Sequence, residues 1–362
     1  MIPDPVPFDR LQRALVIKLR HHGDVLLTSP VFAALKAHVP SIDIDALVYD
    51  DTEEMLSFHP AIREVHCVGR RWRELSAAQR AAAELDLLRR LRAARYDLLI
   101  HLTDHPRGAW LARALGAAVS VAPLRGGRWW RSSFSHLYPT VGGGRRHTVE
   151  THLDALRRIG IHPPQHSRQL VLRPGVAAEQ TIEALLASHG LSGRPFVHLH
   201  PASRWRFKCW SDEATAGLID RIQGDGYRVV LTAAPSASEQ QLIDRVIALC
   251  RHTPAPVNFA GMLSLKQLAA LSARARLFIG VDSAPMHIAA AMQTPTVALF
   301  GPSGDIEWSP WRVPHRVVAS RIHPCRPCGL DGCGGGKVSD CLMTISSEVV
   351  YAAAGELLRE TA

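Results

Sequence analysis

The sequence alternates short runs of β-branched and other apolar residues with longer segments of helical periodicity, and it does so in two successive sets. This alternation is typical of parallel sheets whose strands are joined by helices. The first set ends near residue 172, and the pattern restarts after Pro174-Gly175. We predict an α/β protein with two Rossmann-like domains facing a cleft, residues 1–172 and 173–345. A last segment, residues 346–362, has helical spacing over Ser346–Arg359 and could pack back on the first domain.

The predicted strands of the first set are Ala14–Leu19, Ile42–Val48, Glu64–Val68, Asp97–Leu102 and Ala118–Ala122, with Gln169–Leu172 as a further candidate. The predicted helices of this set are Ser29–His38, Trp72–Ala94, Gly108–Leu115 and Thr148–Ile159. In the second set we predict strands at Phe196–His200, Arg228–Leu231, Val257–Ala260, Leu277–Val281 and Thr296–Phe300. Its predicted helices are Ala177–His189, Asp212–Gln223, Ser238–Arg251, Ser264–Ala273 and Ala284–Met292.

The net charge, the N-terminal segment and the lack of a glycine-rich turn limit the classes of function that this chain can have. The net charge of +9 indicates an anionic partner, which leaves nucleic acid, a phosphorylated substrate and an anionic membrane surface open. The chain begins without a basic, apolar signal segment, and no run approaches the roughly 18 apolar residues of a spanning helix. We therefore expect a cytoplasmic protein. Neither half carries a G-x-G-x-x-G turn, which argues against a nicotinamide or flavin enzyme.

In the first half, Asp24 follows the first predicted strand within Arg20-His21-His22-Gly23-Asp24. At the carboxyl end of a strand in an open α/β sheet, such a carboxylate can act as a general base on a hydroxyl group. The alternative is that Asp24 only caps the following helix. Asp104, at the end of another predicted strand, is the reserve candidate for the base and is also expected to belong to the acceptor-binding residues.

In the second half, two turns carry groups suited to a diphosphate. Asp282-Ser283 ends a predicted strand and a helix begins at Ala284 or Pro285, so its N-terminus and His287 could hold an anion. The loop after Phe196–His200 brings Ser203 and Lys208, and Trp210 is expected to anchor it by packing inward. Cations there would stabilise a departing diphosphate. Each turn could equally be an ordinary helix start or a solvated basic loop.

Two groups of arginines in the first half are predicted to contact acceptor phosphates, although they could also rest on an anionic bilayer or be ordinary exposed loops. They are Arg70, Arg71 and Arg73, and Arg125, Arg128 and Arg131 beside two tryptophans.

We predict no catalytic metal and no cofactor. Asp43-Ile44-Asp45 has the letters of an Asp-x-Asp metal motif, but it lies at the start of a strand and is rejected. Four cysteines within seventeen residues, Cys325, Cys328, Cys333 and Cys341, match zinc spacing imperfectly. They could be a structural zinc site or reduced thiols.

Together these segments resemble the ADP-heptose:lipopolysaccharide heptosyltransferase family over nearly the whole chain, and the stretch Pro327–Ser339 is most similar to its heptosyltransferase III branch. The resemblance implies a GT-B fold and metal-independent, inverting transfer of heptose from ADP-heptose to the anionic lipopolysaccharide inner core, as the third, branch heptose. It implies that Asp24 is the base and that Lys208 binds the donor phosphate. The other donor-binding residues that it implies are Ser203, Leu263, Asp282, Ser283, Ala284 and His287.

Two rival functions remain open from the residues. A sugar-nucleotide epimerase of related architecture would act on the donor alone. A nucleic-acid-binding protein is suggested only by the net charge, and no recognisable binding module supports it.

Overall fold

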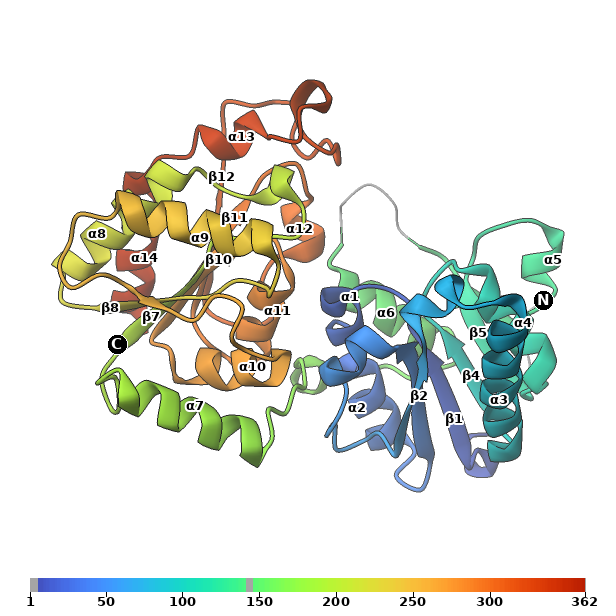
Figure 1. Ribbon diagram of the computed structural model, residues 1–362. Coiled ribbons are helices and arrows are strands. Elements are labelled where there is room, and N and C mark those ends of the chain that lie inside the picture. Colours follow the sequence, from blue (N-terminus) through green and yellow to red (C-terminus); the bar gives the residue numbers. More distant parts are fainter. Residues whose placement is uncertain (1–5, 141–145, 362) are drawn as a thin grey trace. The chain divides into compact units, whose positions relative to one another are not determined.

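The computed structural model describes residues 6–140 and 146–361 and divides into two compact units, Met1–Arg173 and Pro174–Ala362. Each unit contains one six-stranded sheet in which every strand pairing is parallel. The α/β, Rossmann-like architecture expected from the sequence is therefore confirmed (Figure 1).

The first sheet has the strand order β3-β2-β1-β4-β5-β6. Its strands are β1 (Arg13–Ile17), β2 (Asp43–Tyr49), β3 (Glu64–Val68), β4 (Leu98–His101), β5 (Val119–Pro123) and β6 (His136–Tyr138). The helices are α1 (His22–Leu26), α2 (Ser29–His38), α3 (Ala77–Ala94), α4 (Pro106–Leu115), α5 (Arg128–Arg131) and α6 (Thr148–Arg157). Short 3-10 helices lie at Phe8–Arg10, Asp50–Met55, Arg70–Glu74 and Gln165–Arg168.

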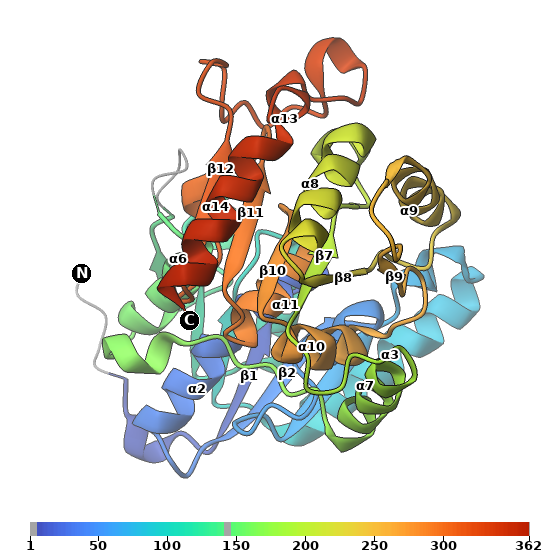
Figure 2. The same cartoon turned by 90° about the vertical axis from the view of Figure 1, so that its left-hand side faces the viewer.

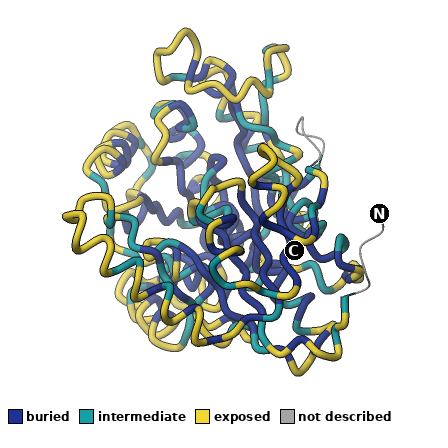
Figure 3. Tube along the Cα trace, turned by 90° about the vertical axis from the view of Figure 1, so that its right-hand side faces the viewer, coloured by how far each residue is buried: buried dark blue, intermediate teal, exposed yellow. Residues whose placement is uncertain are grey.

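Alternating strand residues of this sheet face opposite layers of helices. Leu15, Ile17 and Leu99 form one core cluster with residues of α3, α4 and α5, including Leu87 and Leu111. Helix α2 packs against α6, and α6 contacts β5 and β6. The strands are covered in this way, and most of their residues are buried, with edge strand β3 the most exposed (Figure 3).

The second sheet has the order β12-β11-β10-β7-β8-β9. Its strands are β7 (Phe196–His200), β8 (Arg228–Leu231), β9 (Val257–Asn258), β10 (Leu277–Val281), β11 (Thr296–Phe300) and β12 (His315–Ala319). The helices are α7 (Val176–Ser188), α8 (Asp212–Gly224), α9 (Ala237–Leu249), α10 (Leu265–Arg274), α11 (Ala284–Ala291), α12 (Asp305–Trp308), α13 (Asp340–Met343) and α14 (Ser347–Glu360). Two 3-10 helices lie at Arg206–Lys208 and Cys333–Gly335.

Two helical layers cover this sheet as well. Val197 and Leu199 of β7 belong to a cluster with residues of α8, α9 and α14, whereas Phe196 packs with α7 and α10. Figure 2 shows α8 and α14 in front of the strands, with α14 lying along β11 and β12. The second unit is thus built on the same plan as the first.

Most predicted elements have the expected type, and six correspond to their predicted bounds without change: Ser29–His38, Glu64–Val68, Phe196–His200, Arg228–Leu231, Leu277–Val281 and Thr296–Phe300. The predicted helix Trp72–Ala94 starts too early. The segment Arg70–Glu74 is a 3-10 helix, and α3 begins only at Ala77, after Ser76 caps it through a capping box with Gln79. Gln169–Leu172 is not a strand, and β6 and β12 were not predicted. Helix α14 contacts α8 and β10, β11 and β12 and belongs to the second unit, and the expectation that it could also pack back on the first domain stays a prediction.

Among residues 6–140 and 146–361, none of the helices combines the length and the hydrophobicity that crossing a bilayer requires.

Candidate functional site

In each unit several of the predicted site residues follow the strands at which the strand order reverses, Asp24 and Asp104 in the first and Lys208 and Asp282 in the second. The first sheet runs from β1 through β2 to β3 and then restarts at β4 on the other side of β1, and the second sheet does the same at β7 and β10. Open α/β sheets bind their ligands outside the carboxyl ends of the strands at such switch points. Each unit therefore offers a ligand site at the ends of its first and fourth strands.

Asp24 lies in the first turn of α1, after β1, and its side chain is about one-fifth exposed. The N-cap of α1 is His21, so the alternative that Asp24 is the cap residue is wrong. A carboxylate in the first turn is stabilised by the helix dipole. Asp24 Oδ1 lies 3.9 Å from the ammonium nitrogen of Lys18.

Lys18 is the most unusual group at this site because it is a buried cation. Its Nζ donates to the carbonyl of Leu102, which follows β4, at 3.1 Å, and lies 2.9 Å from Nε2 of His152. His152 Nδ1 lies 3.1 Å from the carbonyl of Leu27, so this nitrogen carries the proton and Nε2 accepts from Lys18. The lysine thus connects β1, β4 and α6 beneath Asp24.

Burial sets the protonation of this group. Desolvation lowers the pKa of Lys18 from 10.5 to about 8, although the negative charges of Asp24 and Asp104 oppose the change. Burial likewise holds the pKa of His152 well below its ordinary value, and the positive charge of Lys18 adds to this effect. At neutral pH Lys18 is therefore mainly an ammonium ion and His152 is neutral.

Asp104, the reserve candidate for the base, lies at the same edge of the sheet. Its two oxygens accept from Arg20 at 3.2 Å and from Arg125 at 3.1 Å, and it is well exposed. Two guanidinium groups thus neutralise Asp104, whereas Asp24 has no ion-pair partner closer than Lys18 among the described residues. This difference in surroundings favours Asp24 as the base.

The structure separates the predicted acceptor arginines into two groups. Arg70 pairs with Asp51 and donates to the carbonyl of Arg20, and Arg71 pairs with Glu74. Arg125 is engaged by Asp104. Among the six predicted acceptor arginines, the three without a carboxylate partner in the described part of the chain are Arg73, Arg128 and Arg131.

The second unit places Lys208 against Asp282. Lys208 Nζ donates to Asp282 Oδ2 at 2.5 Å, which joins the loop after β7 to the turn after β10. Asp282 is buried, and the lysine side chain is about one-quarter exposed. Ser203 is buried in the same loop as Lys208, and its Oγ accepts from the backbone N–H of Trp205 at 3.3 Å. The predicted phosphate-binding lysine is therefore held by a carboxylate at the predicted donor site.

Helix α11 starts at this point, as predicted. Ser283 is the N-cap residue, Ala284 is the first helical residue, and Pro285 follows. The Ser283 hydroxyl donates to the carbonyl of Val281 at 3.2 Å rather than capping the helix. His287 is buried in the helix, with its ring centre 6.4 Å from that of Trp308. The start of this helix presents a positive dipole end beside Lys208 and Asp282.

Leu263 lies in the loop between β9 and α10 and is partly buried against the cluster that contains Phe259 and Leu271. It shares the carboxyl edge of the second sheet with the other predicted donor residues, because its loop follows β9. No described side-chain contact joins it to Lys208 or Asp282.

The prediction that Trp210 anchors the basic loop is confirmed. Its side chain is buried in the core cluster with α8 and α14, and Nε1 donates to the carbonyl of Ile345 at 2.9 Å. Ser339 makes a second tie, since its hydroxyl donates to the carbonyl of Phe207 at 2.7 Å. These two bonds fix the segment that carries Lys208.

Among the described residues, only Asp45, Glu64 and His66 bring three metal-ligating groups together. Asp45 already accepts from Arg63 and from the Tyr96 hydroxyl. Burial raises its pKa, but hydrogen bonds from His66, Arg63 and Tyr96 outweigh burial and hold it at about 2. The oxygens of Asp45 are therefore already occupied by structural hydrogen bonds.

The cysteines of the C-terminal stretch do not form a group of three ligands in the described part of the chain. Cys325, Cys328 and Cys333 are exposed thiols and Cys341 is buried. Burial raises the pKa of Cys341; the positive charge of Arg326 opposes this effect, and Cys333, Cys328 and Cys325 add to it. The choice between reduced thiols and a structural metal site stays a prediction.

Sequence reasoning missed Lys18 and His152. A lysine directly after the apolar run Ala14–Ile17 was a usable signal, because a charged residue at a buried strand end requires a partner. No comparable signal pointed to His152, which lies far along the chain in α6.

Residues 85–338 match the model of glycosyltransferase family 9, which is described as heptosyltransferase. The chain is 36% identical over 296 residues to lipopolysaccharide heptosyltransferase 3 of Escherichia coli, covering 81% of this chain and 84% of that protein. It is 28% identical over 330 residues to lipopolysaccharide heptosyltransferase 1 of Pseudomonas aeruginosa, covering 87% and 86%.

Solved structures agree with this relationship at the level of the fold. A family 9 glycosyltransferase from Veillonella parvula matches with a TM-score of 0.81 at 22% identity, covering 96% of this chain and 97% of that chain. The ADP-heptose lipopolysaccharide heptosyltransferase II of E. coli matches with a TM-score of 0.77 at 22% identity, covering 97% and 100%. With 36% identity to a curated relative over most of its length, this chain belongs to glycosyltransferase family 9, the heptosyltransferases.

Proposed function

We propose that this protein transfers a heptose from ADP-heptose to the inner core of lipopolysaccharide and adds the third, branch heptose. The choice of the third heptose is supported by the identity to heptosyltransferase 3 proteins of E. coli, which exceeds that to heptosyltransferase 1 proteins. The residues Pro327–Ser339, which resemble the same branch of the family, also support it.

The second unit binds the ADP-sugar in this proposal. Lys208 and the start of α11 at Ser283 and Ala284 meet the diphosphate, because an ammonium group and a helix N-terminus both favour an anion. Asp282 holds Lys208 in place through their hydrogen bond. Ser203, Leu263 and His287 complete the proposed donor-binding set. An E. coli heptosyltransferase of the same fold was solved with ADP, which is consistent with such a donor.

The first unit binds the anionic acceptor in this proposal. Arg73, Arg128 and Arg131 are exposed and lack carboxylate partners among the described residues, so they are the arginines best able to contact phosphate. Arg70, Arg71 and Arg125 must exchange a carboxylate for the acceptor before they can contribute.

Transfer proceeds with inversion in a single displacement. Asp24 accepts the proton of the acceptor hydroxyl. At the same time the oxygen of this hydroxyl attacks the anomeric carbon of the donor sugar from the face opposite ADP. The bond between that carbon and the diphosphate oxygen breaks, and its electron pair leaves with ADP. Lys208 and the dipole of α11 stabilise the growing negative charge.

No metal takes part in this scheme, because the lysine and the helix start supply the positive charge that a divalent ion supplies elsewhere. We further propose that the enzyme works in the cytoplasm, peripherally at the inner membrane, where a lipid-linked acceptor is accessible.

One observation carries the proposal most strongly. In this chain, each unit places a lysine and a carboxylate within ion-pair distance at its topological switch point. The pairs are Lys18 with Asp24 and Lys208 with Asp282. The test is incubation of the purified protein with ADP-heptose and core acceptors that carry no heptose, one heptose or two heptoses.

Mass measurement should detect one added heptose only on the acceptor that already carries two, together with release of ADP. The anomeric configuration of the new bond, read by nuclear magnetic resonance, tests inversion. Conversion of the donor in the absence of acceptor would instead assign an epimerase and contradict the proposal.

A further inference from the structure

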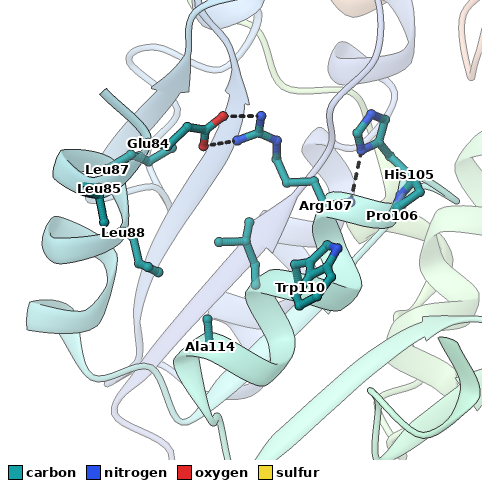
Figure 4. A pocket seen from close by; sticks show the side chains of 10 residues that line it. Glu84, Leu85, Leu87, Leu88, His105, Pro106, Arg107, Trp110 and Ala114 are labelled. Carbon is teal, nitrogen blue, oxygen red and sulfur yellow. Dashed lines mark hydrogen bonds and ion pairs between the residues drawn. The ribbon is translucent and has the colours of Figure 1, made fainter. Parts of the chain in front are cut away.

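Two features of the described residues take no part in the proposed reaction. The first is a groove of about 530 Å³ between α3 and α4 of the first unit. It is lined mainly by apolar side chains, with the ion pair of Glu84 and Arg107 at one side (Figure 4). The second is a chain of buried polar side chains in the second unit. This chain ends at the carboxyl end of β7, where the proposed donor site begins.

The buried chain is a continuous line of hydrogen bonds that runs from helix α10 to the end of β7. Ser272 Oγ lies 3.1 Å from Nδ1 of His198, and Nε2 of the same ring lies 2.8 Å from the Thr232 hydroxyl. That hydroxyl lies 2.8 Å from Nδ1 of His200, the last residue of β7. At most 5% of any of these four residues is exposed. Because a buried polar group is costly unless it is hydrogen-bonded, each proton of the chain requires an acceptor.

Burial keeps both imidazole rings of the chain neutral. Desolvation lowers the pKa of His198 well below its ordinary value, and the neighbouring His200 adds to this effect. Desolvation lowers the pKa of His200 from 6.5 to about 4. In a neutral imidazole one nitrogen carries the proton and the other accepts a hydrogen bond. At neutral pH the hydrogen bonds of the chain can therefore run in only two directions.

The hydroxyl of Ser272 distinguishes these two directions. If His198 donates from Nδ1 to Ser272, the hydroxyl proton of Ser272 needs a different acceptor, and the described residues provide none. If Ser272 donates to Nδ1 of His198, the proton of that ring is on Nε2 and is donated to Thr232. Thr232 then donates to Nδ1 of His200. Every proton of the chain has an acceptor in this second direction, which leaves the proton of His200 on Nε2.

Nε2 of His200 is the outer end of the chain. It makes no hydrogen bond to the described residues, and it is not one of their fully buried unpaired atoms, so this nitrogen borders solvent. His200 pairs with Gly280 of β10, two residues before Asp282, and the loop that carries Ser203 and Lys208 follows it. An N–H group at this place can serve a ligand that binds at the switch point of the second sheet.

We propose that His200 donates a hydrogen bond from Nε2 to an oxygen of the nucleotide part of the donor, and that Thr232, His198 and Ser272 hold its tautomer. The inference rests on the proposed function and adds a residue to its donor site. The accepting oxygen belongs to the diphosphate or to the ribose, and both are present in ADP. A neutral N–H is directional, so it complements the ammonium group of Lys208, which attracts the nucleotide by its charge.

The experiment is calorimetric titration of the full-length protein with ADP, AMP and adenosine. His200→Phe keeps an aromatic ring but loses the N–H, so the Kd for ADP should rise about tenfold. His200→Gln can place an amide N–H near the position of Nε2 and should bind ADP more tightly than His200→Asn, whose amide reaches only the position of Nδ1. An effect on ADP that adenosine does not show assigns the accepting oxygen to the phosphates, and an equal effect on all three ligands assigns it to the ribose.

The matched control for these variants is His315→Phe. His315 is a half-buried histidine at the start of β12, and its Nδ1 contacts the carbonyl of Val313. This variant should bind ADP like the wild type, and thermal unfolding checks that each variant is folded.

A second set of variants tests the chain behind His200. Thr232→Val has nearly the same shape but cannot donate to Nδ1 of His200, so ADP should bind several-fold more weakly. Thr232→Ser restores the hydroxyl and should recover the affinity. Thr181→Val is the control, because the hydroxyl that it removes donates within α7 to the carbonyl of Ala177.

The tautomer itself can be measured by nuclear magnetic resonance of protein with isotope-labelled histidine nitrogens. The signals of His200 are those that disappear in His200→Gln. They should place its proton on Nε2 in the wild type, and Thr232→Val should move part of it to Nδ1. A purely structural role of Thr232 would not move this proton.

Two results would overturn the inference and leave the proposed function intact. They are wild-type affinity of His200→Phe for ADP, and a proton on Nδ1 of His200 in the wild type. Failure of the wild type to bind ADP would instead contradict the proposed function.

Discussion

Lys18 and Asp24 lie next to each other at the end of the first strand, with Nζ 3.9 Å from Oδ1, and the lysine is buried while the carboxylate is partly exposed. The separation is too long for a hydrogen bond. Asp24 therefore has a positive neighbour but keeps its oxygens available to a substrate hydroxyl. The second unit differs at the corresponding place, since Lys208 and Asp282 are hydrogen-bonded at 2.5 Å. There the lysine, rather than the carboxylate, is the group left to meet a ligand.

The role of Asp24 predicts a selective loss of activity. Asp24→Asn keeps the size of the side chain but removes its ability to accept a proton, so the transfer rate should fall by about 10²- to 10⁴-fold. ADP binding, measured by calorimetry, should change little because the proposed donor site lies in the second unit. Asp104→Asn is the matched control, and we expect it to retain most of the transfer rate. The assignment fails if Asp24→Asn remains active or if Asp104→Asn is the inactive variant.

The buried lysine predicts a dependence of stability on pH. Burial lowers the pKa of Lys18 from 10.5 to about 8, so between these values the unfolded chain holds a proton at this residue that the folded chain has released. The free energy of unfolding therefore increases as the pH rises through this window, by up to about 3 kcal/mol from this group. Lys18→Met lacks this contribution.

Urea unfolding of the wild type and of Lys18→Met from about pH 7 to about pH 10.5 checks this prediction. Other titrating groups are common to both proteins, so the difference between the two free energies isolates Lys18. The wild type should gain relative to the variant with rising pH. A constant difference would show that the lysine is not buried as a cation.

The pair of Lys208 and Asp282 predicts coupled effects on donor binding. Lys208→Met removes the proposed phosphate ligand, and the KM for ADP-heptose should rise by about tenfold or more because a charge-assisted hydrogen bond is lost. ADP should then raise the Tm of this variant less than that of the wild type. Asp282→Asn keeps the ammonium group but loosens its position, so its effect should be smaller. Equal stabilisation of the wild type and Lys208→Met by ADP would exclude Lys208 from the donor site.

Trp210 anchors the loop that carries Lys208, and this role can be tested by removing a single hydrogen bond. Trp210→Phe keeps an aromatic ring in the core but removes the N–H that donates to the carbonyl of Ile345. We expect a loss of about 1 kcal/mol in stability, with a raised KM for the donor because the loop also carries Lys208. Trp205→Phe, at an exposed tryptophan of the same loop, is the control and should leave stability unchanged. The same Tm for wild type and Trp210→Phe would speak against an anchoring role.

Metal dependence makes a further prediction. A chelator such as EDTA should leave the transfer rate unchanged, because Lys208 and the start of α11 are proposed to supply the positive charge. Metal analysis of the purified protein should find no stoichiometric zinc, because the four cysteines form no three-ligand group in the described part of the chain. Loss of activity in EDTA that added divalent ions restore would contradict the proposed mechanism.

Local patterns were enough to predict much of the fold because strands and helices leave strong periodic signals. Phe196–His200 and Ser29–His38 were found at their observed bounds for this reason. Strand β6 was missed because it has only three residues, and its first, His136, is polar. The start of α3 was misplaced because the Trp72 segment has helical composition, and only the reciprocal capping bonds of Ser76 and Gln79 define the true beginning.

The sequence by itself determined that this chain forms two parallel α/β units and that Asp24, Lys208 and the Asp282-Ser283 turn lie at strand ends. Strand periodicity and turn residues are local properties, so they can be read without knowing which strands pair. Only the tertiary structure decided that Lys18 is buried against Leu102 and His152, and that Lys208 is held by Asp282. Those partners lie 74 to 134 residues away along the chain, and only the strand order of each sheet brings them together.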